Sequence, residues 1–512
     1  MTLERIYNNA ALSVEDRVAH LMAEMTIEEK VAQLVGVWAS DLIDSERRFS
    51  PEQARQSVAH GAGHITRVGA VSMLRPVESA TLTNAIQKFL IEETRLGIPA
   101  IIHEESCAGY LARGATSFPQ SIGMAATWQP ELVEAMAKVI RQQMRAVGAH
   151  HTLAPVLDVV RDARWGRMEE TYGEDPFLVS ALGTAYVRGV QSDDWADGII
   201  ATAKHFIGYS FSEGGLNWAP AHIPERLLRE VFLPPFIAAI REGKAGSVMN
   251  AYQELDGLPA GSAVWLMVDL LRDEIGFDGV VVSDYFTINM FAEYHHIAAT
   301  KGEAARYGLE AGIDVELPDA DCYGQPLLDA LENGDIDMAL VDVSLRRVLD
   351  MKMRLRLFEN PYVDTGSVLT VYNTPEQIAL TRKLAEQTIV LLKNDNELLP
   401  LRGDLGKIAV IGPSADSTRL LQADYHYPAH MEGIVDLPSD TMEAPAPGKQ
   451  LKSVDWEEHR PPSTTVLQGI RARAGSSTQV IYAKGCASTG DDMSGFADAT
   501  AAAKQADVAV VV

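Results

Sequence analysis

Short apolar runs that end abruptly in polar residues recur along the first part of the chain. The clearest is 279–282, a valine run typical of a buried strand, which is followed by Ser283, Asp284 and Tyr285. Similar runs with polar ends lie at 98–105, 153–158, 199–205, 247–252 and 313–316. One polar strand end is usually a helix cap or a turn. Several around one sheet predict a pocket rim, because a barrel gathers the carboxyl ends of its strands into a small circle.

Helical patterns alternate with these runs. In 130–147, Pro130 suits the first turn, apolar residues recur at helical spacing, and Gly148 supplies a C-terminal stop. The ranges 227–241 and 265–274 show a similar pattern, and a basic helix is expected over 343–356. Alternating strands and helices predict βα units around a parallel sheet, and about 350 residues suit a TIM-like (β/α)8 barrel with insertions.

A second α/β domain is expected after the barrel. The barrel is assigned to 1–358, a linker to 359–384 because turn residues dominate 360–366, and the second domain to 385–512. Its expected core strands are 389–394, 408–413, 480–482 and 508–512, with a long loop, functional or disordered, over 426–462. The chain stops inside what is expected to be a buried strand, which indicates a truncated domain.

Composition excludes several classes of function. With 47% hydrophobic and 22% charged residues the chain is an ordinary globular protein, and a formal net charge of −26 disfavours nucleic acid and anionic membranes as partners. Cys107, Cys322 and Cys486 lie far apart without metal-ligand spacing, so neither a disulfide framework, a metal nor a cofactor is expected. A leader sequence and a membrane-length apolar run are both missing from the sequence, so a cytoplasmic location is expected.

Several motifs occur together in a fixed order. They are Phe-Pro-Gln at 118–120, Ala-Ala-Thr-Trp at 125–128, Arg-Asp-Ala-Arg-Trp-Gly-Arg at 161–167, Glu-Thr-Tyr-Gly-Glu-Asp-Pro at 170–176, Lys-His-Phe at 204–206 and Ser-Asp-Tyr at 283–285. With these motifs the chain resembles glycoside hydrolase family 3 from about residue 26 to its last residue. The resemblance implies a barrel followed by an αβα sandwich, and it implies an exo-acting retaining β-glucosidase that acts on small oligosaccharides or β-glycosides. Oligomeric state is left open, a homo-oligomer included.

By this resemblance Asp284 is the nucleophile that forms a covalent glycosyl-enzyme. It must stay ionised near neutral pH, and Lys204 and Arg167 are expected to lower its pKa. The resemblance also assigns substrate binding to a set of side chains in the deepest subsite. The members of this set are Glu105, Arg167, Lys204, His205, Met249, Tyr252 and Tyr285.

Within that set, Glu105 is expected to accept hydrogen bonds from sugar hydroxyls, while Arg167, Lys204 and His205 donate them. Tyr285 stands where most relatives carry Trp, and its ring is expected to pack on a sugar face. The purely structural alternative for Glu105 is a salt-bridged strand-end acid. The other charges around Arg167 are read as an ion-pair network, and His150 and His151 as packing residues.

Departures from the family pattern leave the substrate and mechanism open. Most relatives have Asp where Glu105 stands, and the longer side chain favours a pentose, so β-xylosidase is the alternative. Leu216 replaces an Arg that binds substrate in many relatives.

The general acid/base is expected not to lie within the chain, because 208–214 lacks the Asp-Ser-His loop of one branch, and the other branch places a Glu beyond the strand that ends at Val512. A sugar-binding protein without turnover is therefore a second class of function. A Schiff-base aldolase that uses Lys204 is a third.

Overall fold

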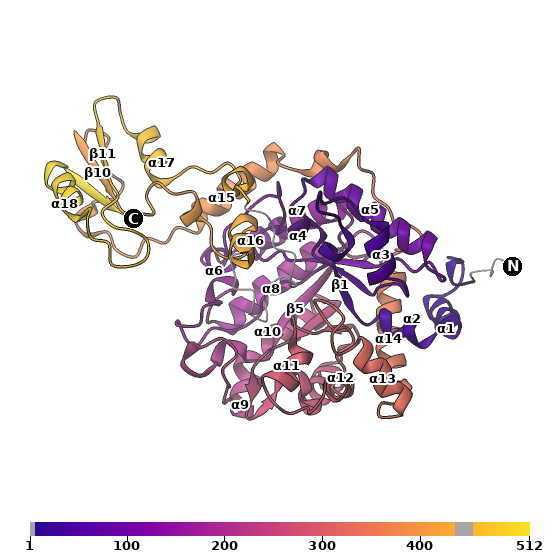
Figure 1. Ribbon diagram of the computed structural model, residues 1–512. Coiled ribbons are helices and arrows are strands. Elements are labelled where there is room, and N and C mark those ends of the chain that lie inside the picture. The colour runs from indigo at the N-terminus through magenta and orange to yellow at the C-terminus, as the bar shows by residue number, and fades with distance from the viewer. Residues whose placement is uncertain (1–5, 436–453) are drawn as a thin grey trace. The chain divides into compact units, whose positions relative to one another are not determined.

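The computed structural model describes residues 6–435 and 454–512. The chain divides into two compact units, Met1–Thr388 and Ile389–Val512, and each is described by itself. The strands and helices expected for the barrel lie in the first unit, and a smaller sheet with its helices lies in the second (Figure 1).

A parallel sheet forms the centre of the first unit. Among the described residues its strand order is β1-β2-β3-β4-β5-β6-β9. The bounds are β1 (Gly36–Trp38), β2 (His64–Thr66), β3 (Ile101–Glu104), β4 (His151–Thr152), β5 (Ile200–Phe206), β6 (Ser247–Asn250) and β9 (Val280–Val282). Parallel bridges from Val35 to Glu316 and from Val282 to Val315 join the segment 313–316 to both ends of this sheet. The sheet is thus closed into a TIM-like barrel, as predicted.

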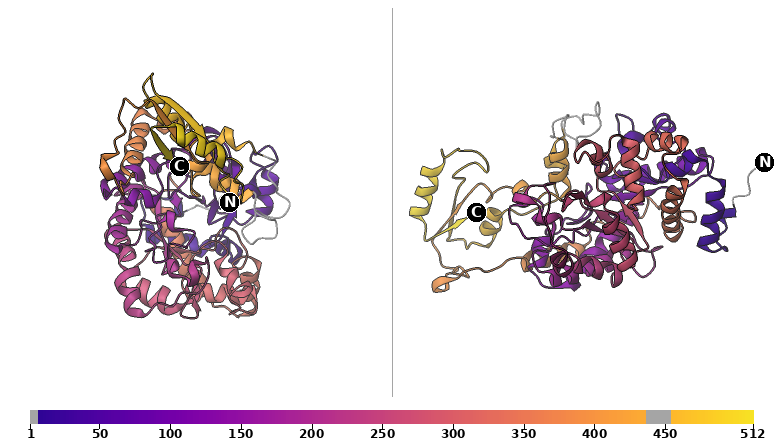
Figure 2. Two further views of the ribbon diagram at one scale, coloured as in Figure 1. Left: turned by 90° about the vertical axis from the view of Figure 1, so that its left-hand side faces the viewer. Right: turned by 90° about the horizontal axis from the view of Figure 1, so that it is seen from below.

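Helices cover the outside of the barrel strands (Figure 1). The main ones are α1 (Val14–Glu24), α2 (Ile27–Ala32), α3 (Pro51–Ser57), α4 (Val68–Ser72), α5 (Pro76–Glu93), α6 (Ser121–Ala125), α7 (Pro130–Ala146), α8 (Pro176–Gln191), α9 (Glu225–Leu227), α10 (Pro234–Arg241), α11 (Thr287–Glu293), α12 (Lys301–Glu310), α13 (Gln325–Asn333), α14 (Met338–Arg354) and α15 (Pro375–Gln387). The N-terminal α1 packs against α14, so the two ends of the barrel sequence meet (Figures 1 and 2).

The helical patterns of the sequence correspond to observed helices. The range 130–147 forms α7, which ends before Gly148 at φ 79°. The pattern at 265–274 forms a π-helical segment, Trp265–Glu274, and 227–241 divides into α9, a π-helical segment Leu228–Phe232, and α10. A small antiparallel hairpin, β7 (Glu254–Leu255) and β8 (Leu258–Pro259), follows β6.

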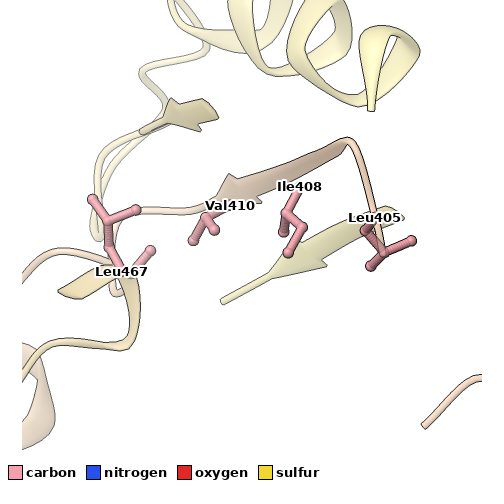
Figure 3. Close-up of a cluster of buried hydrophobic side chains, with 5 residues drawn as sticks. Leu405, Ile408, Val410 and Leu467 are labelled. Carbon is pink, nitrogen blue, oxygen red and sulfur yellow. The ribbon is translucent and has the colours of Figure 1, made fainter. Parts of the chain in front are cut away.

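The second unit contains a parallel sheet flanked by helices. In its described part the strand order is β11-β10-β12, with β10 (Lys407–Ile411), β11 (Gln479–Ala483) and β12 (Val508–Val511). Leu405, Ile408 and Val410 gather with Leu467 of α17 (Val466–Arg473) on one face (Figure 3). On the other face Ala409 packs with Ala502 of α18 (Phe496–Gln505). Helices on both faces of a parallel sheet make an αβα sandwich.

Two expectations for the second unit are wrong. The range 389–394 is not a core strand, because nothing in the described structure pairs with its backbone, and Ile389 and Leu392 are 80% and 91% exposed. Part of the expected loop 426–462 is the helix α16 (Tyr427–Val435), while 436–453 lie outside the described residues. An apolar run in the sequence predicts a buried strand, but a strand forms only where another segment supplies hydrogen-bond partners for its backbone.

The end of the chain is a strand but not a buried one. β12 pairs with β10 as expected, yet Val511 is 76% exposed. β12 lies at the edge of the described sheet, where neighbours cover less of each side chain.

The range expected to be a linker contains regular structure. A short 3-10 helix, Val368–Val371, and α15 lie within or overlap 359–384, and both belong to the first unit. Tyr372 donates a hydrogen bond to the Gln143 carbonyl of α7 over 2.8 Å, which fixes this segment on the barrel. Across the described residues, no helix is long and apolar enough to cross a membrane.

Candidate active site

The strand ends of the barrel bring polar side chains to one mouth, because parallel strands all point the same way. Glu105 follows β3, Lys204 and His205 lie in β5, Asn250 ends β6 and Asp284 follows β9. All five side chains are buried. The pairing of β5 with β6 shifts register between Ala203 and Phe206, where Lys204 and His205 lie.

Asp284 is held by backbone and side-chain groups at this mouth. Its Oδ1 accepts a hydrogen bond from the Tyr285 N–H over 2.8 Å, and its own N–H donates to Asn250 Oδ1 over 3.3 Å. Burial raises the pKa of Asp284 to about 6, although Arg167, Lys204 and the Tyr252 hydroxyl act to lower it. The cations act in the direction expected from sequence, but burial outweighs them.

His205 links Asp284 to a buried partner acid. Asp158 Oδ2 lies 2.8 Å from His205 Nδ1, and Asp284 Oδ2 lies 3.5 Å from His205 Nε2. Burial, with Arg167 and Lys204 nearby, keeps the pKa of His205 well below its usual value, so the ring is neutral. Arg167 donates to Nε2 over 3.0 Å, which leaves the ring proton on Nδ1 for Asp158.

In this arrangement the outer nitrogen of His205 accepts from Arg167, so the expected donation from His205 to a sugar requires the ring proton on Nε2 instead. The sequence places Asp158 at the end of an apolar run, but nothing in it identifies this acid as the partner of His205. Burial raises the pKa of Asp158 to about 7.

Arg167 makes a two-pronged ion pair with Glu170. Its Nε and an outer nitrogen donate to the two carboxylate oxygens over 2.6 Å and 2.8 Å. Arg164 pairs with Asp162 on the surface, and Asp175 caps α8. The observed ion-pair network therefore includes Arg167, which the sequence predicted only as a substrate ligand. The Arg167 guanidinium also lies 5.6 Å from the Tyr209 ring centre.

Glu105 lies between two buried cations. Lys204 Nζ is 3.1 Å from its Oε2, and an Arg67 nitrogen is 3.0 Å from its Oε1. Burial alone would raise the pKa of Glu105, but Lys204 and Arg67 together hold it below its usual value. In the same way, Glu105 keeps the pKa of Lys204 above its usual value against the effect of burial. Glu105 is thus both salt-bridged and placed at the mouth.

Sequence reasoning missed Arg67 because its strand is short and polar. β2 reads His-Ile-Thr, so no apolar run marked its end. Arg67 has φ 54°, between β2 and α4, and is buried.

Aromatic side chains line the same end of the barrel. Tyr252 is buried beside Tyr209 and Trp218, with ring centres 5.8 Å and 5.6 Å away, and Met249 is buried in β6. The Tyr285 hydroxyl lies 3.0 Å from His103 Nε2, and the Arg67 guanidinium lies 5.2 Å from its ring.

Other polar strand ends have structural roles. Glu104 accepts from the Gly69 N–H over 2.6 Å, and burial raises its pKa to about 8. Glu316 accepts hydrogen bonds from the N–H groups of 321–323 and so holds the loop after its segment. The observed rim therefore includes fewer polar strand ends than the sequence predicted, because Glu104 and Glu316 bind backbone N–H groups instead.

Histidines inside the barrel belong to its core. His150 Nδ1 accepts from the Ile102 N–H over 3.2 Å, and His151 contacts Thr202 over 2.7 Å, so both pack as expected. Over 6–435 and 454–512, no group of His, Cys, Asp and Glu side chains has a geometry that could hold a metal ion.

Comparison with known proteins agrees with this geometry. The model of the glycosyl hydrolase family 3 N-terminal domain matches residues 26–351, and that of the C-terminal domain matches 389–512. A β-xylosidase of Formosa agariphila is 38% identical over 82% of this chain and 57% of its own length. A periplasmic β-glucosidase of Salmonella typhimurium is 32% identical over 99% of this chain and 64% of its own length.

Solved structures are also similar. A β-glucosidase from Erythrobacter marinus superposes with a TM-score of 0.85 at 31% identity, covering 99% of this chain and 66% of that one. A β-glucosidase from Listeria innocua in complex with glucose gives 0.79 at 29% identity, covering 98% of this chain and 64% of that one. The chain thus spans roughly three fifths of the length of these proteins.

Proposed function

Because the chain belongs to glycoside hydrolase family 3, we propose that it acts as a retaining exo-β-glycosidase. In this proposal it removes a non-reducing terminal β-D-glucosyl residue through a covalent glycosyl-enzyme. The substrates are small oligosaccharides or β-glycosides.

The observation that carries the proposal is the surroundings of Asp284. A retaining glycosidase needs an ionised carboxylate that can attack the anomeric carbon. Asp284 follows the barrel strand β9, its Oδ1 is fixed by the Tyr285 N–H, and Arg167 and Lys204 act to keep it ionised. With a pKa of about 6, it is mostly charged at neutral pH.

The remaining groups are proposed to bind the glycone. Glu105 stays ionised between Lys204 and Arg67, so its oxygens can also accept hydrogen bonds from sugar hydroxyls. His205 accepts from Arg167 and so holds that guanidinium at the mouth, where Arg167 and Lys204 supply donors. Met249, Tyr252 and Tyr285 provide the apolar and aromatic walls.

The stereochemistry of hydrolysis tests this proposal. Proton NMR should show the β-anomer of glucose as the first product from an aryl β-glucoside, because two inversions at the anomeric carbon give net retention. If the α-anomer is released first, the double-displacement mechanism is wrong. If no glycoside is cleaved or bound, the proposed class of function is wrong.

A β-D-xylosidase is the second candidate, favoured by the position of Glu105. The two cations on Glu105 fix its longer side chain in place, so it cannot easily swing away from an exocyclic C6 group. The name of the Formosa relative, β-xylosidase, also favours this activity. Comparing kcat/KM for aryl β-xyloside and β-glucoside decides between the two.

A shorter side chain at position 105 tests whether Glu105 selects the sugar. Glu105→Asp shortens the side chain and should shift the ratio of kcat/KM values from xyloside towards glucoside. An unchanged ratio would show that Glu105 does not select the sugar.

A further inference from the structure

The Tyr285 side chain is held from several directions. Its hydroxyl lies 3.0 Å from Nε2 of His103, the Arg67 guanidinium lies 5.2 Å from its ring centre, and Trp38 meets it edge to face at 5.7 Å. These partners come from β3, from the end of β2 and from β1. Tyr285 therefore points its hydroxyl into the barrel, rather than offering it to a ligand at the mouth.

His103 holds the Tyr285 hydroxyl from a fixed, uncharged position. It is fully buried, and burial keeps its pKa well below the usual value, so the ring is neutral. Its ring also lies near that of His64, with centres 5.9 Å apart. A neutral buried imidazole and a phenol form a short, specific pair, and either partner can donate.

Tyr285 directly follows Asp284 in the chain, so the position of Tyr285 affects the carboxylate of Asp284. The Tyr285 N–H donates to Asp284 Oδ1 over 2.8 Å, while Oδ2 faces His205. If the ring of Tyr285 were free to turn, the N–H on the same residue would be less well fixed. The carboxylate would then lose part of its orientation.

We propose that His103 is a positioning residue, which holds Tyr285 so that its N–H orients the carboxylate of Asp284 for attack. This rests on the proposed function. In this proposal His103 acts through Tyr285. The proposed role also gives a reason for a Tyr beside the proposed nucleophile, because the phenol hydroxyl reaches a partner inside the barrel.

A double-mutant cycle on covalent labelling tests the proposal. A 2-deoxy-2-fluoro-β-glycosyl fluoride is mixed with the protein, and intact mass follows formation of the adduct. His103→Leu and Tyr285→Phe should each slow labelling by about three- to tenfold, as expected for one buried hydrogen bond. The double variant should be no slower than the slower single variant, because both changes remove the same interaction.

Two further variants separate positioning from stability. His103→Gln can still bond the phenol and should recover part of the rate. His151→Leu is the matched control, because His151 is also fully buried in the barrel but contacts Thr202. His151→Leu should lower the unfolding temperature about as much as His103→Leu does. Its effect on the labelling rate should be the same with and without Tyr285→Phe.

The outcomes are distinguishable. Independent, multiplicative effects of His103→Leu and Tyr285→Phe would overturn the proposal, as would equal slowing by His151→Leu. If the unsubstituted protein forms no adduct, the proposed function itself fails, and the positioning role fails with it.

Discussion

Burial controls the charge of Asp284 more strongly than the neighbouring cations do. Its pKa is raised to about 6 even though Arg167 and Lys204 act to lower it. A carboxylate attacks only when ionised, so kcat/KM should fall as the pH decreases through about 6 and level off above it. A pH profile with an aryl glycoside measures this, and an acid limb near pH 4 would contradict the assignment.

The effect of Arg167 on this acid limb can be isolated. Arg167→Met removes the cation that lowers the pKa of Asp284 most, so the limb should move to higher pH. Arg164→Met is the matched control, because Arg164 is exposed and pairs with Asp162. It should leave the limb in place.

Lys204 is expected to contribute to binding through Glu105 and through its own donors. Lys204→Met leaves Glu105 with Arg67 alone and should lower kcat/KM about tenfold or more. Lys352→Met offers a comparison, since Lys352 is equally buried but bonds Gln33 and the Ala62 carbonyl. It should reduce the unfolding temperature without a comparable loss of kcat/KM. Equal kinetic losses would mean that Lys204 acts only through stability.

At the residue scale, the sequence predicted which side chains lie at the site better than it predicted their protonation and hydrogen bonding. Glu105, Lys204, His205 and Asp284 could be predicted because each ends or interrupts an apolar run. The proton on His205 could not, because it depends on Arg167 and Asp158, which are distant in sequence. Arg67 was missed because its strand carries no apolar run.

At the scale of elements, the junction after α7 depends on a glycine. Gly148 has φ 79°, and an added Cβ would lie 2.6 Å from Thr83 Cγ2, a stiff β-branched side chain. Gly148→Ala should therefore cost about 2–4 kcal/mol, combining the left-handed backbone with the overlap. Gly276→Ala is the control, because Gly276 has φ 85° but no atom near an added Cβ.

Urea unfolding of the two variants measures this difference. Gly276→Ala should lose only about 1 kcal/mol, the cost of the backbone conformation alone. Equal losses for both variants would show that Thr83 yields without cost.

The elements themselves were predictable where packing and hydrogen bonding agree. The strands β5, β6 and β9 and the helix α7 follow from apolar runs and helical spacing, because each is covered by its neighbours along the chain. None of the predicted strands covers β1 or β2. The range 389–394 has the same apolar character, yet it forms no strand in the described structure. Whether this range forms a strand depends on a second segment that pairs with it, and the sequence of one segment does not show whether such a partner is present.

At the scale of the whole molecule, the described site contains the proposed nucleophile, Asp284, but suggests no general acid. Glu213, the acid in the loop after β5, is exposed and pairs with His222 over 3.2 Å. We expect a polypeptide of residues 1–512 to cleave dinitrophenyl glycosides far faster than alkyl glycosides, by about 10²–10⁴-fold more than leaving-group reactivity alone explains. Rates for both classes measure this. Efficient cleavage of alkyl glycosides would place the acid within 1–512.

The identity of the nucleophile is the claim on which the account depends, and covalent trapping measures it directly. After reaction with the fluoro-glycoside, intact mass should rise by one glycosyl unit, and peptide mapping should locate the adduct at Asp284. Asp284→Asn should show no adduct, because an amide is a poor nucleophile. An adduct on any other carboxylate, or undiminished labelling of Asp284→Asn, would contradict the account.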